Sequence, residues 1–300
     1  MRSRAMILAA GALATAGAVA GFAGGQTALA SATAASAGSV PSIVKLVPKA
    51  IRSGGRLTVA SDATYAPDEF IGSNGTTVVG MDADLMNAIG KVMGLKVSIA
   101  NVTFDNIIPG MVAGRYMIGA SSFTDTKARE KQVNFVDYAY VGESFYTLAH
   151  GGTNIKSIAN ICGLTVSVEK GTTEETDAQA QSKTCTKEGK KAVNVRVFPD
   201  QTEANLAVSS GRAQLGFADT PVADYQVKEA HGKFRLVGAA YAPAPYGLAV
   251  AKSTGSLTDA VKAAVLYLVK NGTYNKIFKK WGVQSIEIKA SGVKIDGAAS

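Results

Sequence analysis

The chain has 300 residues, too many for one small core and suitable for two lobes, and its 47% apolar and 18% charged residues are typical of a globular protein. Its formal net charge of +8 comes from scattered basic residues, with no basic run interleaved with aromatics, which argues against a nucleic-acid-binding protein. After the first thirty residues, no stretch approaches the roughly 20 apolar residues of a membrane-spanning helix.

The first thirty residues have the pattern of a secretory signal peptide. Arg2 and Arg4 form a short basic start, residues 5–23 are apolar or small, and a small-x-small cleavage pattern ends at Ala30. A transmembrane anchor is the less favoured alternative, because a stretch rich in Ala and Gly is only weakly hydrophobic. We expect cleavage near Ala30 and export, followed by a flexible mature terminus over residues 31–50. No Cys lies near Ala30 to carry a lipid.

The first half of the mature chain alternates short strands with helices. Residues 81–93 predict an amphipathic helix, because their Met, Leu and Ile side chains fall on one stripe. Asp105 is a candidate N-cap for the next helix. The predicted strands span residues 56–61, 95–102 and 118–121, and the predicted helices span residues 81–93 and 104–113.

The second half repeats this alternation. Gly211 would end one helix, and Thr220 would cap another that has Pro221 at its first position. The final stretch, residues 285–300, alternates weakly and predicts a strand or a tail. The predicted strands span residues 164–168, 193–198 and 214–218, and the predicted helices span residues 202–210, 221–230, 257–270 and 274–281.

Two strand–helix series predict an α/β protein of two similar, Rossmann-like lobes with mainly parallel sheets and helices on both faces. Two extended apolar segments, residues 145–149 and 246–250, are interpreted as paired crossover strands that join the lobes. The predicted domains are lobe 1 over 51–145 and 247–284, lobe 2 over 146–246, and a C-terminal tail over 285–300. Because ligands bind at the carboxyl ends of strands in such sheets, site residues should directly follow strands.

Two polar clusters follow strands of the first lobe. Asp62 and Tyr65 come directly after the first strand, and a carboxylate beside an aromatic ring suits a polar or cationic group. The hydroxyls of Ser122 and Thr124 precede Arg129, a combination that suits a carboxylate. The alternatives are a connecting surface loop for the first cluster and a solvated helix charge for Arg129.

Two further clusters follow strands of the second lobe. Residues 169–173 begin with Glu169, contain Gly171 and end with Thr173, which can cap a helix. Asp219 closes a later strand and is placed to receive an ammonium group.

The only two cysteines are Cys162 and Cys185. An even pair in an exported protein predicts a disulfide. Closing a loop of this length would add about 3 kcal/mol to the free energy of unfolding. The two histidines, His150 and His231, lack the spacing of metal ligands, so we expect no metal site.

Seven segments together resemble, in order and spacing, the bacterial extracellular solute-binding proteins that serve polar amino-acid ABC importers, the family 3 type. The likeness covers roughly residues 55–283 and implies the type II periplasmic-binding-protein fold. Asp68, Met117 and Asn134 depart from the usual family pattern. The matching segments are residues 62–70, 80–85, 104–109, 124–135, 171–173, 219–221 and 271–281.

The resemblance implies how the ends of a bound amino acid would be held. Arg129 would hold the α-carboxylate, helped by Thr124 and the backbone near Ser122. Asp219 would bind the α-ammonium, and Thr173 would contribute from the second lobe.

The resemblance also implies which residues would contact the ligand side chain. Tyr65 and Phe104 would sandwich its aliphatic part, and Asp62 and Glu169 would face its end. A zwitterion with a neutral side chain would pair only Arg129 and one carboxylate, leaving two unpaired. The charge count therefore favours a basic ligand such as arginine, lysine or ornithine, with glutamine or another polar neutral amino acid next.

The resemblance implies a secreted, monomeric binding protein that closes around an amino acid and delivers it to the membrane permease of an ABC importer. No catalytic residue and no cofactor is implied. Two alternatives stay open. One is an exported dehydratase-type enzyme on the same fold, with Glu169 or Asp62 as general acid or base. The other is a sensor or wall-associated binding module without a transporter.

Overall fold

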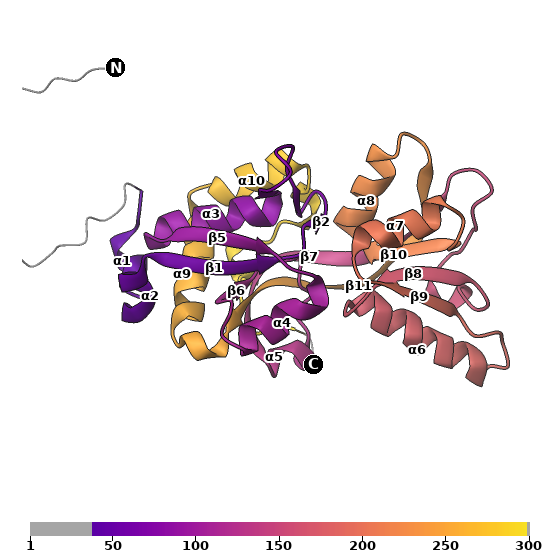
Figure 1. Cartoon of the computed structure of the whole chain (residues 1–300), viewed down its shortest axis with the longest axis horizontal. Helices are drawn as coiled ribbons and strands as arrows, with labels where there is room; N and C mark the ends of the chain where they lie inside the picture. The colour runs from indigo at the N-terminus through magenta and orange to yellow at the C-terminus, as the bar shows by residue number, and fades with distance from the viewer. Residues whose placement is uncertain (1–37, 299–300) are drawn as a thin grey trace, which may run out of the picture. The chain divides into compact units, whose positions relative to one another are not determined.

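The computed structural model describes residues 38–298, so the predicted signal peptide over 1–30, its cleavage site and residues 31–37 lie outside the described part. Eight strands form one continuous mixed sheet, in the order β5-β1-β6-β11-β7-β10-β8-β9 (Figure 1). Within residues 38–298, no helix has the length and apolar character needed to cross a membrane. The predicted α/β architecture of two Rossmann-like lobes is confirmed.

Lobe 1 is built on parallel pairing of β1 with β5 and β6. Helix α3 has the predicted bounds, and its Met81, Leu85 and Ile89 are fully buried. It ends at Gly94, whose φ of 71° is left-handed and favours glycine. The main elements are β1 (Arg56–Ser61), α3 (Met81–Met93), β5 (Lys96–Asn101), α4 (Phe104–Val112), β6 (Ile118–Gly119), α5 (Lys127–Glu130), α9 (Leu257–Lys270) and α10 (Thr273–Trp281).

Lobe 2 repeats the arrangement, with β8 parallel to both β9 and β10. Helix α6 has few apolar residues and buries only Glu174, Ala178 and Cys185, so its extent was not visible as an apolar stripe. The main elements are β8 (Thr165–Glu169), α6 (Thr173–Lys187), β9 (Asn194–Phe198), α7 (Gln201–Ser209), β10 (Leu215–Asp219) and α8 (Thr220–Glu229), with a 3-10 turn over Ile158–Asn160.

Two long antiparallel strands, β7 (Val133–Leu148) and β11 (Phe234–Ala251), run through both lobes. The predicted segments 145–149 and 246–250 lie in these strands but do not pair with each other. Tyr146 is opposite Leu236, and Tyr246 is opposite Ala139. The prediction of two paired crossover strands is confirmed for β7 and β11 as whole strands. The two predicted segments are not opposite each other, because register is set by contacts along the whole ladder and not by the apolar runs alone.

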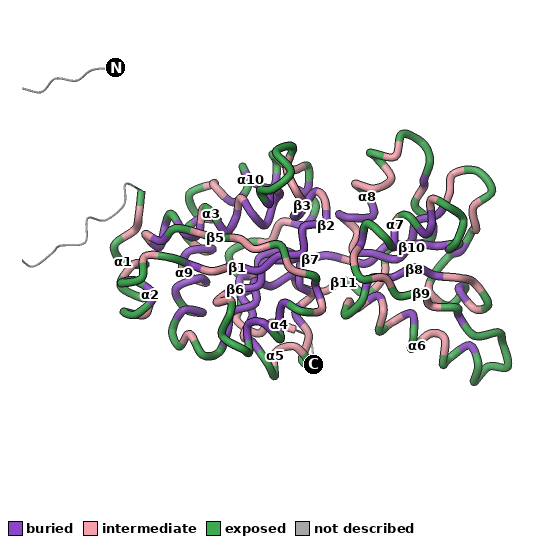
Figure 2. The backbone as a smooth tube through the Cα atoms, in the orientation of Figure 1, coloured by how far each residue is buried: buried purple, intermediate pink, exposed green. Residues whose placement is uncertain are grey.

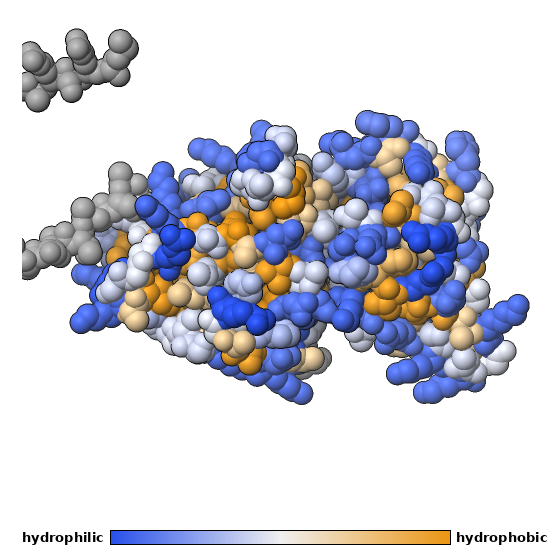
Figure 3. Space-filling model, in the orientation of Figure 1, coloured by the Kyte–Doolittle hydropathy of each residue, from blue (hydrophilic) through white to orange (hydrophobic). Residues whose placement is uncertain are grey.

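The three largest apolar clusters form the cores, and only one of them joins the two lobes. One contains α3, α9 and α10 in lobe 1, and another contains α6 in lobe 2. The third spans both lobes, joining α4 to α7 and α8. Figure 2 shows buried central strands, whereas the edge strands β5 and β9 are largely exposed or intermediate. The face in Figure 3 is mostly hydrophilic, with apolar patches spread over both lobes.

A small antiparallel sheet of β2 (Thr64–Tyr65), β3 (Glu69–Ile71) and β4 (Val78–Val79) follows β1. It folds the first polar cluster back over α3. Gly80 must be glycine here, since a Cβ would lie 2.1 Å from the Asp68 carbonyl oxygen and its φ is +134°.

Both ends of the described chain are more ordered than the sequence predicts. Residues 38–50 were expected to be flexible, but α1 (Pro41–Val44) and α2 (Lys49–Gly54) bring Ile43, Val47 and Ile51 into the core of lobe 1. At the other end, the expected tail docks on β7 through short bridges, with 3-10 turns over Gln284–Ile286 and Ala290–Gly292. Apolar side chains in both segments drive this packing.

Three predicted helix caps are wrong by one or two residues. Helix α4 begins after Thr103, and Asp105 lies in its first turn. Thr172, not Thr173, caps α6 by accepting a hydrogen bond from the Glu175 amide. Helix α8 begins at Thr220, whose hydroxyl donates to the Gly142 carbonyl oxygen and is therefore not a cap.

The predicted disulfide between Cys162 and Cys185 is present and ties the start of lobe 2 to α6. We expect the double variant Cys162→Ala, Cys185→Ala to lose about 3 kcal/mol of unfolding free energy, because the unfolded chain regains the entropy of an open loop. Urea unfolding measures this loss. A reducing agent should destabilise the wild type and leave the variant unchanged. Equal unfolding midpoints for the two proteins would contradict the prediction.

Candidate ligand-binding site

A small cavity lies between the lobes, with a volume of about 20 Å³, the space of about one water molecule. Seven of the nine residues proposed from sequence line it. Asp62 and Glu169 do not appear in its wall, although both are buried. The lining residues are Tyr65, Phe104, Ser122, Thr124, Arg129, Thr172, Thr173, Glu174, Gln201, Ala218, Asp219 and Val222.

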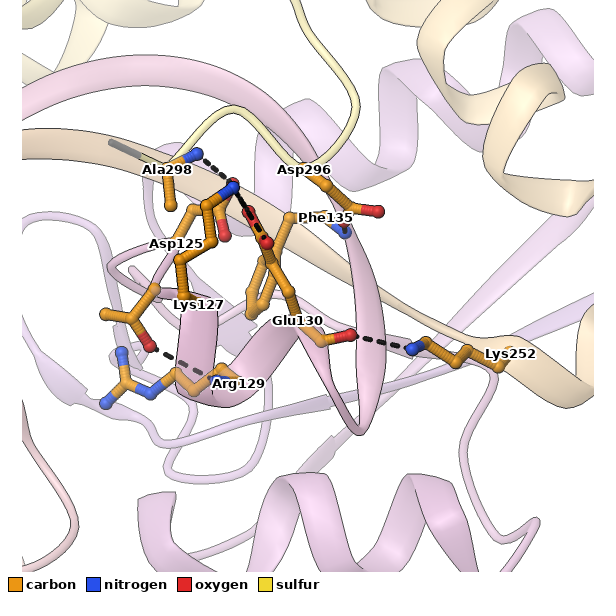
Figure 4. Close-up of polar contacts among 9 residues, drawn as sticks. Asp125, Lys127, Arg129, Glu130, Phe135, Lys252, Asp296 and Ala298 are labelled. Carbon is orange, nitrogen blue, oxygen red and sulfur yellow. Dashed lines mark hydrogen bonds and ion pairs between the residues drawn. The ribbon is translucent and has the colours of Figure 1, made fainter. Parts of the chain in front are cut away.

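Arg129 reaches into this cavity from α5 in lobe 1. The helix is capped by Thr126, whose hydroxyl accepts a hydrogen bond from the Arg129 amide at 3.2 Å. Figure 4 shows the Arg129 side chain extending away from this helix. The guanidinium donates through Nη1 to the Thr124 carbonyl oxygen at 2.8 Å and through Nη2 to the Gly171 carbonyl oxygen of lobe 2 at 3.0 Å. Arg129 therefore bridges the lobes.

The Arg129 guanidinium packs against aromatic rings. Its Cζ atom lies 5.2 Å from the Phe104 ring centre and 5.4 Å from that of Phe123, within the range of cation–π attraction. Tyr65 meets Phe104 edge-on at 5.9 Å. In this conformation the two rings contact each other, so an aliphatic chain does not fit between them.

Ser122 has a left-handed backbone, with φ of 49°, which is strained for a residue other than glycine. Three buried carboxyl groups hold it in place. Its amide donates to Asp82 at 3.0 Å, and its hydroxyl lies 3.1 Å from a carboxylate oxygen of Asp68 and 3.3 Å from one of Glu69. The backbone near Ser122 was expected to donate to a ligand carboxylate, but the Ser122 amide already donates to Asp82.

Acidic groups from lobe 2 face Arg129. Asp219 ends β10, and Glu174 lies in the first turn of α6 with 3% of its surface exposed. Burial raises the pKa of Glu174 to about 7, although the nearby Arg129 charge lowers it. Burial and the Glu174 charge raise the pKa of Asp219 well above its ordinary value. The cavity therefore brings one basic group together with two acidic ones.

Asp62 and Glu169 are buried outside the cavity wall, where they contact other protein groups. Asp62 accepts hydrogen bonds from the Thr64 hydroxyl at 2.8 Å and from the Phe104 amide at 2.9 Å, so it anchors the start of α4. Both carboxylate oxygens of Glu169 are buried without a hydrogen-bond partner, as is the Tyr65 hydroxyl. Burial, followed by the charge of Asp62, raises the pKa of Glu169 to about 10.

Direct contacts close the lobes over the cavity. The hydroxyl oxygens of Thr124 and Thr173 are 3.3 Å apart across the cleft. Lys170 of lobe 2 forms an ion pair with Asp105 of lobe 1 at 2.8 Å. The structure is therefore a closed form of the two lobes.

Sequence reasoning missed five residues of the cavity wall, namely Thr172, Glu174, Gln201, Ala218 and Val222. Gln201 follows β9, so the rule that sites lie after strands pointed to its position. Glu174 directly follows the third predicted cluster. No group of three or more His, Cys, Asp or Glu side chains within residues 38–298 is arranged to hold a metal ion.

Residues 57–284 match the model of the bacterial extracellular solute-binding proteins, family 3. The chain belongs to this family. All residues that line the small cavity lie within this matched range.

Named members of the family are similar to the chain over most of its length. The arginine-binding protein ArgT of Corynebacterium glutamicum is 35% identical over 82% of this chain and 80% of its own length. ABC transporter arginine-binding protein 1 of Escherichia coli is 27% identical over 75% of this chain and 90% of its own length.

Two solved structures are also similar. An ancestral arginine-binding protein bound to arginine has 34% identity and a TM-score of 0.69, over 76% of this chain and 98% of that one. An ancestral amino-acid-binding protein described as a precursor of cyclohexadienyl dehydratase has 32% identity and a TM-score of 0.69, over 77% and 97%. These relatives are binding proteins, although one stands at the origin of an enzyme.

The raised pKa of Glu169 predicts how stability depends on pH. Between pH 4.5 and about pH 10, the Glu169 carboxyl keeps its proton in the folded protein and loses it in the unfolded chain. The free energy of unfolding therefore falls as pH rises through this range. Replacing Glu169 with Gln removes one titrating group. We expect the ligand-free wild type to lose about 1.4 kcal/mol more per pH unit than the variant.

Urea unfolding of both proteins at pH 6 and pH 8 measures this difference. Glu203→Gln, an exposed change of the same kind on α7, should follow the wild type. Parallel wild-type and Glu169→Gln curves would show that the Glu169 carboxyl is ionised in the folded protein.

Proposed function

We propose that this protein is the extracytoplasmic binding component of an ABC importer and that its ligand is a basic amino acid, with arginine the first choice. The observation that carries the proposal is a cavity where a guanidinium from lobe 1 faces carboxyl groups from lobe 2. The printed names of the relatives, arginine-binding and ABC transporter proteins, support the same choice.

The two ends of the amino acid would be held by opposite lobes. Arg129 would pair with the α-carboxylate by exchanging its bond to the Gly171 carbonyl oxygen for the stronger charge-assisted one. Asp219 and Glu174 would receive the α-ammonium, and the cation would restore both carboxylates to their charged form.

The far end of the ligand decides the ligand class. The two buried oxygens of Glu169 face only the Tyr65 hydroxyl and the Asp62 carboxyl, and two buried carboxyl groups side by side are costly unless a cationic donor reaches them. A guanidinium or ammonium at the end of the ligand side chain would supply that donor and its charge. A neutral amide would satisfy the oxygens only in part, so this carboxyl favours arginine over glutamine.

Binding would require the lobes to open and close. The cavity of about 20 Å³ is too small for an amino acid, so β7 and β11 would act as hinges that admit the ligand. The ion pair between Lys170 and Asp105 would form again on closure. A micromolar ligand needs roughly −8 kcal/mol, which two charge-assisted contacts and burial of an aliphatic stem can supply.

An extracytoplasmic location and a membrane permease as partner follow from the same proposal. The family description and the basic, apolar start of the sequence support export. Dehydratase chemistry has less support, since Asp62 already accepts two hydrogen bonds and the named relatives are binding proteins.

Truncating the clamp tests the site. Arg129→Ala should weaken arginine binding at least about a hundredfold, because the ligand carboxylate would be buried without its partner. Isothermal titration calorimetry measures the affinity. Arg212→Ala, which removes an exposed arginine of lobe 2, serves as the control and should bind like the wild type. Unchanged affinity in Arg129→Ala would mean that the ligand binds elsewhere.

Neutralising Glu169 tests the ligand class. Glu169→Gln should weaken arginine binding about tenfold or more, because a charge-assisted contact is worth roughly 1.5–3 kcal/mol, and should change glutamine binding little. Titration of both amino acids into both proteins gives the selectivity. An equal loss for the two amino acids would remove the role given to Glu169 while leaving the clamp intact.

A further inference from the structure

The strands of lobe 1 share an outer edge, on the side of the sheet opposite the cleft. The parallel strands β1, β5 and β6 begin at this edge. β11 is antiparallel to β6 and ends there, and β7 is antiparallel to β11 and begins there. Figure 1 shows β1 running from the end that carries α1 and α2 towards lobe 2. Neighbouring strands are about 4.8 Å apart, so an edge of five strands is about 20 Å wide.

Each of these five strands has an exposed basic residue at the outer edge. Two of them are the first residues of β1 and β5, one directly follows β11, and two come shortly before β6 and β7. In the part of the chain that the structure describes, none of the five forms an ion pair with a carboxylate. Glu130 lies beside this edge but is already paired with Lys127 at 3.0 Å. The five residues, called the basic edge below, are Arg56, Lys96, Arg115, Lys131 and Lys252.

The fold holds these like charges close together. Arg56 and Lys96 are directly opposite each other in the register of β1 and β5, and like charges in such a pair repel and destabilise a sheet. Arg52 and Lys91 add charge at the last turns of α2 and α3, where the helix dipole favours a cation. Strands have no comparable dipole to favour the basic edge. A partner with negative charge would relieve this repulsion.

Charge is also divided unevenly between the lobes. Lobe 1, over 38–145 and 247–298, has 18 Lys and Arg against 13 Asp and Glu, whereas lobe 2, over 146–246, has 11 against 10. Nearly all of the positive excess therefore belongs to lobe 1.

Within lobe 1, acids lie towards the opposite end of the strands. Asp62, Asp105 and Asp125 follow the carboxyl ends of β1, β5 and β6, which face the cleft. Lobe 1 is thus polarised along its strands. A negatively charged surface would attract its outer edge and repel its cleft side, which fixes how the protein would approach that surface.

Two exposed aliphatic side chains indicate the kind of surface. Leu46 lies between α1 and α2, flanked by Lys45 and Lys49, and is 42% exposed. Val112 ends α4, three residues before Arg115, and is 63% exposed. Apolar side chains among cations suit a lipid bilayer, because they enter the headgroup layer while the cations contact phosphates. A polyanion in water has no apolar layer to receive them.

We propose that the basic edge, together with Leu46 and Val112, is a docking surface that holds this protein on anionic phospholipid headgroups. Its use on the outer face of a membrane rests on the proposed export, whereas its affinity for such lipids does not. Docking through the outer edge of lobe 1 would leave the cleft clear of the bilayer and lobe 2 free to open and close.

Cosedimentation with vesicles tests this surface. The mature chain is mixed with phosphatidylcholine vesicles that contain about 30% phosphatidylglycerol, in about 0.1 M salt. We expect binding that disappears on phosphatidylcholine alone and weakens as salt rises. Each Lys or Arg near an anionic bilayer contributes about fivefold to binding. The triple variant Arg56→Gln, Lys96→Gln, Lys131→Gln should therefore bind about a hundredfold more weakly.

The matched control neutralises three exposed lysines of lobe 2 in the variant Lys183→Gln, Lys187→Gln, Lys191→Gln. It loses the same net charge and should stay within about threefold of the wild type. Equal losses in the two triple variants would overturn the proposal, because net charge alone would then explain binding. Absence of wild-type binding to the anionic vesicles would overturn it as well.

A single substitution separates a bilayer from other polyanions. Leu46→Ser should weaken vesicle binding about twofold or more, whereas Leu206→Ser, at a 54% exposed leucine of lobe 2, should have no effect. Unchanged binding of Leu46→Ser would overturn the assignment to lipid. Arginine titrated into the outer-edge triple variant should bind as in the wild type. Failure of the wild type to bind arginine would count against the proposed function and leave this surface standing.

Discussion

The contact between Arg129 and lobe 2 is the interaction on which the closed form depends. Among the described residues that line the small cavity, Arg129 is the only basic one, and it faces Glu174 and Asp219 while bonding the Gly171 carbonyl oxygen. Burial lowers the pKa of Arg129, and these acids oppose that shift. Carboxyl groups around the cavity thus stabilise the buried positive charge of Arg129. A zwitterion with one extra positive charge would bring the total of positive and negative charges in the cavity to equality.

The sheet makes this contact possible because two strands belong to both lobes. β7 and β11 pair along most of their length, and β10 joins β7 where Asp219 is opposite Glu143. In the proposed opening, motion about these strands would change the distance between the lobes without breaking the apolar core within either lobe. Register shifts near Val237 and Tyr241 interrupt the ladder where the lobes meet, which is where bending costs least.

Buried acids are concentrated around the cleft, and each cluster has a different consequence. Asp68, Glu69 and Asp82 are fully buried around Ser122 and hold its strained backbone. Glu169 ends a strand beneath Tyr65 without hydrogen-bond partners. Buried acids without a positive partner reduce the stability of a fold, so binding of the proposed cationic ligand would be more favourable. The proposed site would therefore be built at a cost to the stability of the empty protein.

The sequence by itself determined those features that depend on local patterns of residues. The apolar stripe of residues 81–93 predicted that helix to the residue, and the cysteine pair predicted the disulfide. The rule that sites follow strands, together with the family resemblance, pointed to seven residues that line one cavity. Only the tertiary structure decided the register of β7 and β11, the docking of the C-terminal segment, and the use of Asp62 as an anchor for α4. Periodicity and turn chemistry act over a few neighbouring residues, whereas strand register depends on residues more than a hundred positions away, such as Val133 and Ala251.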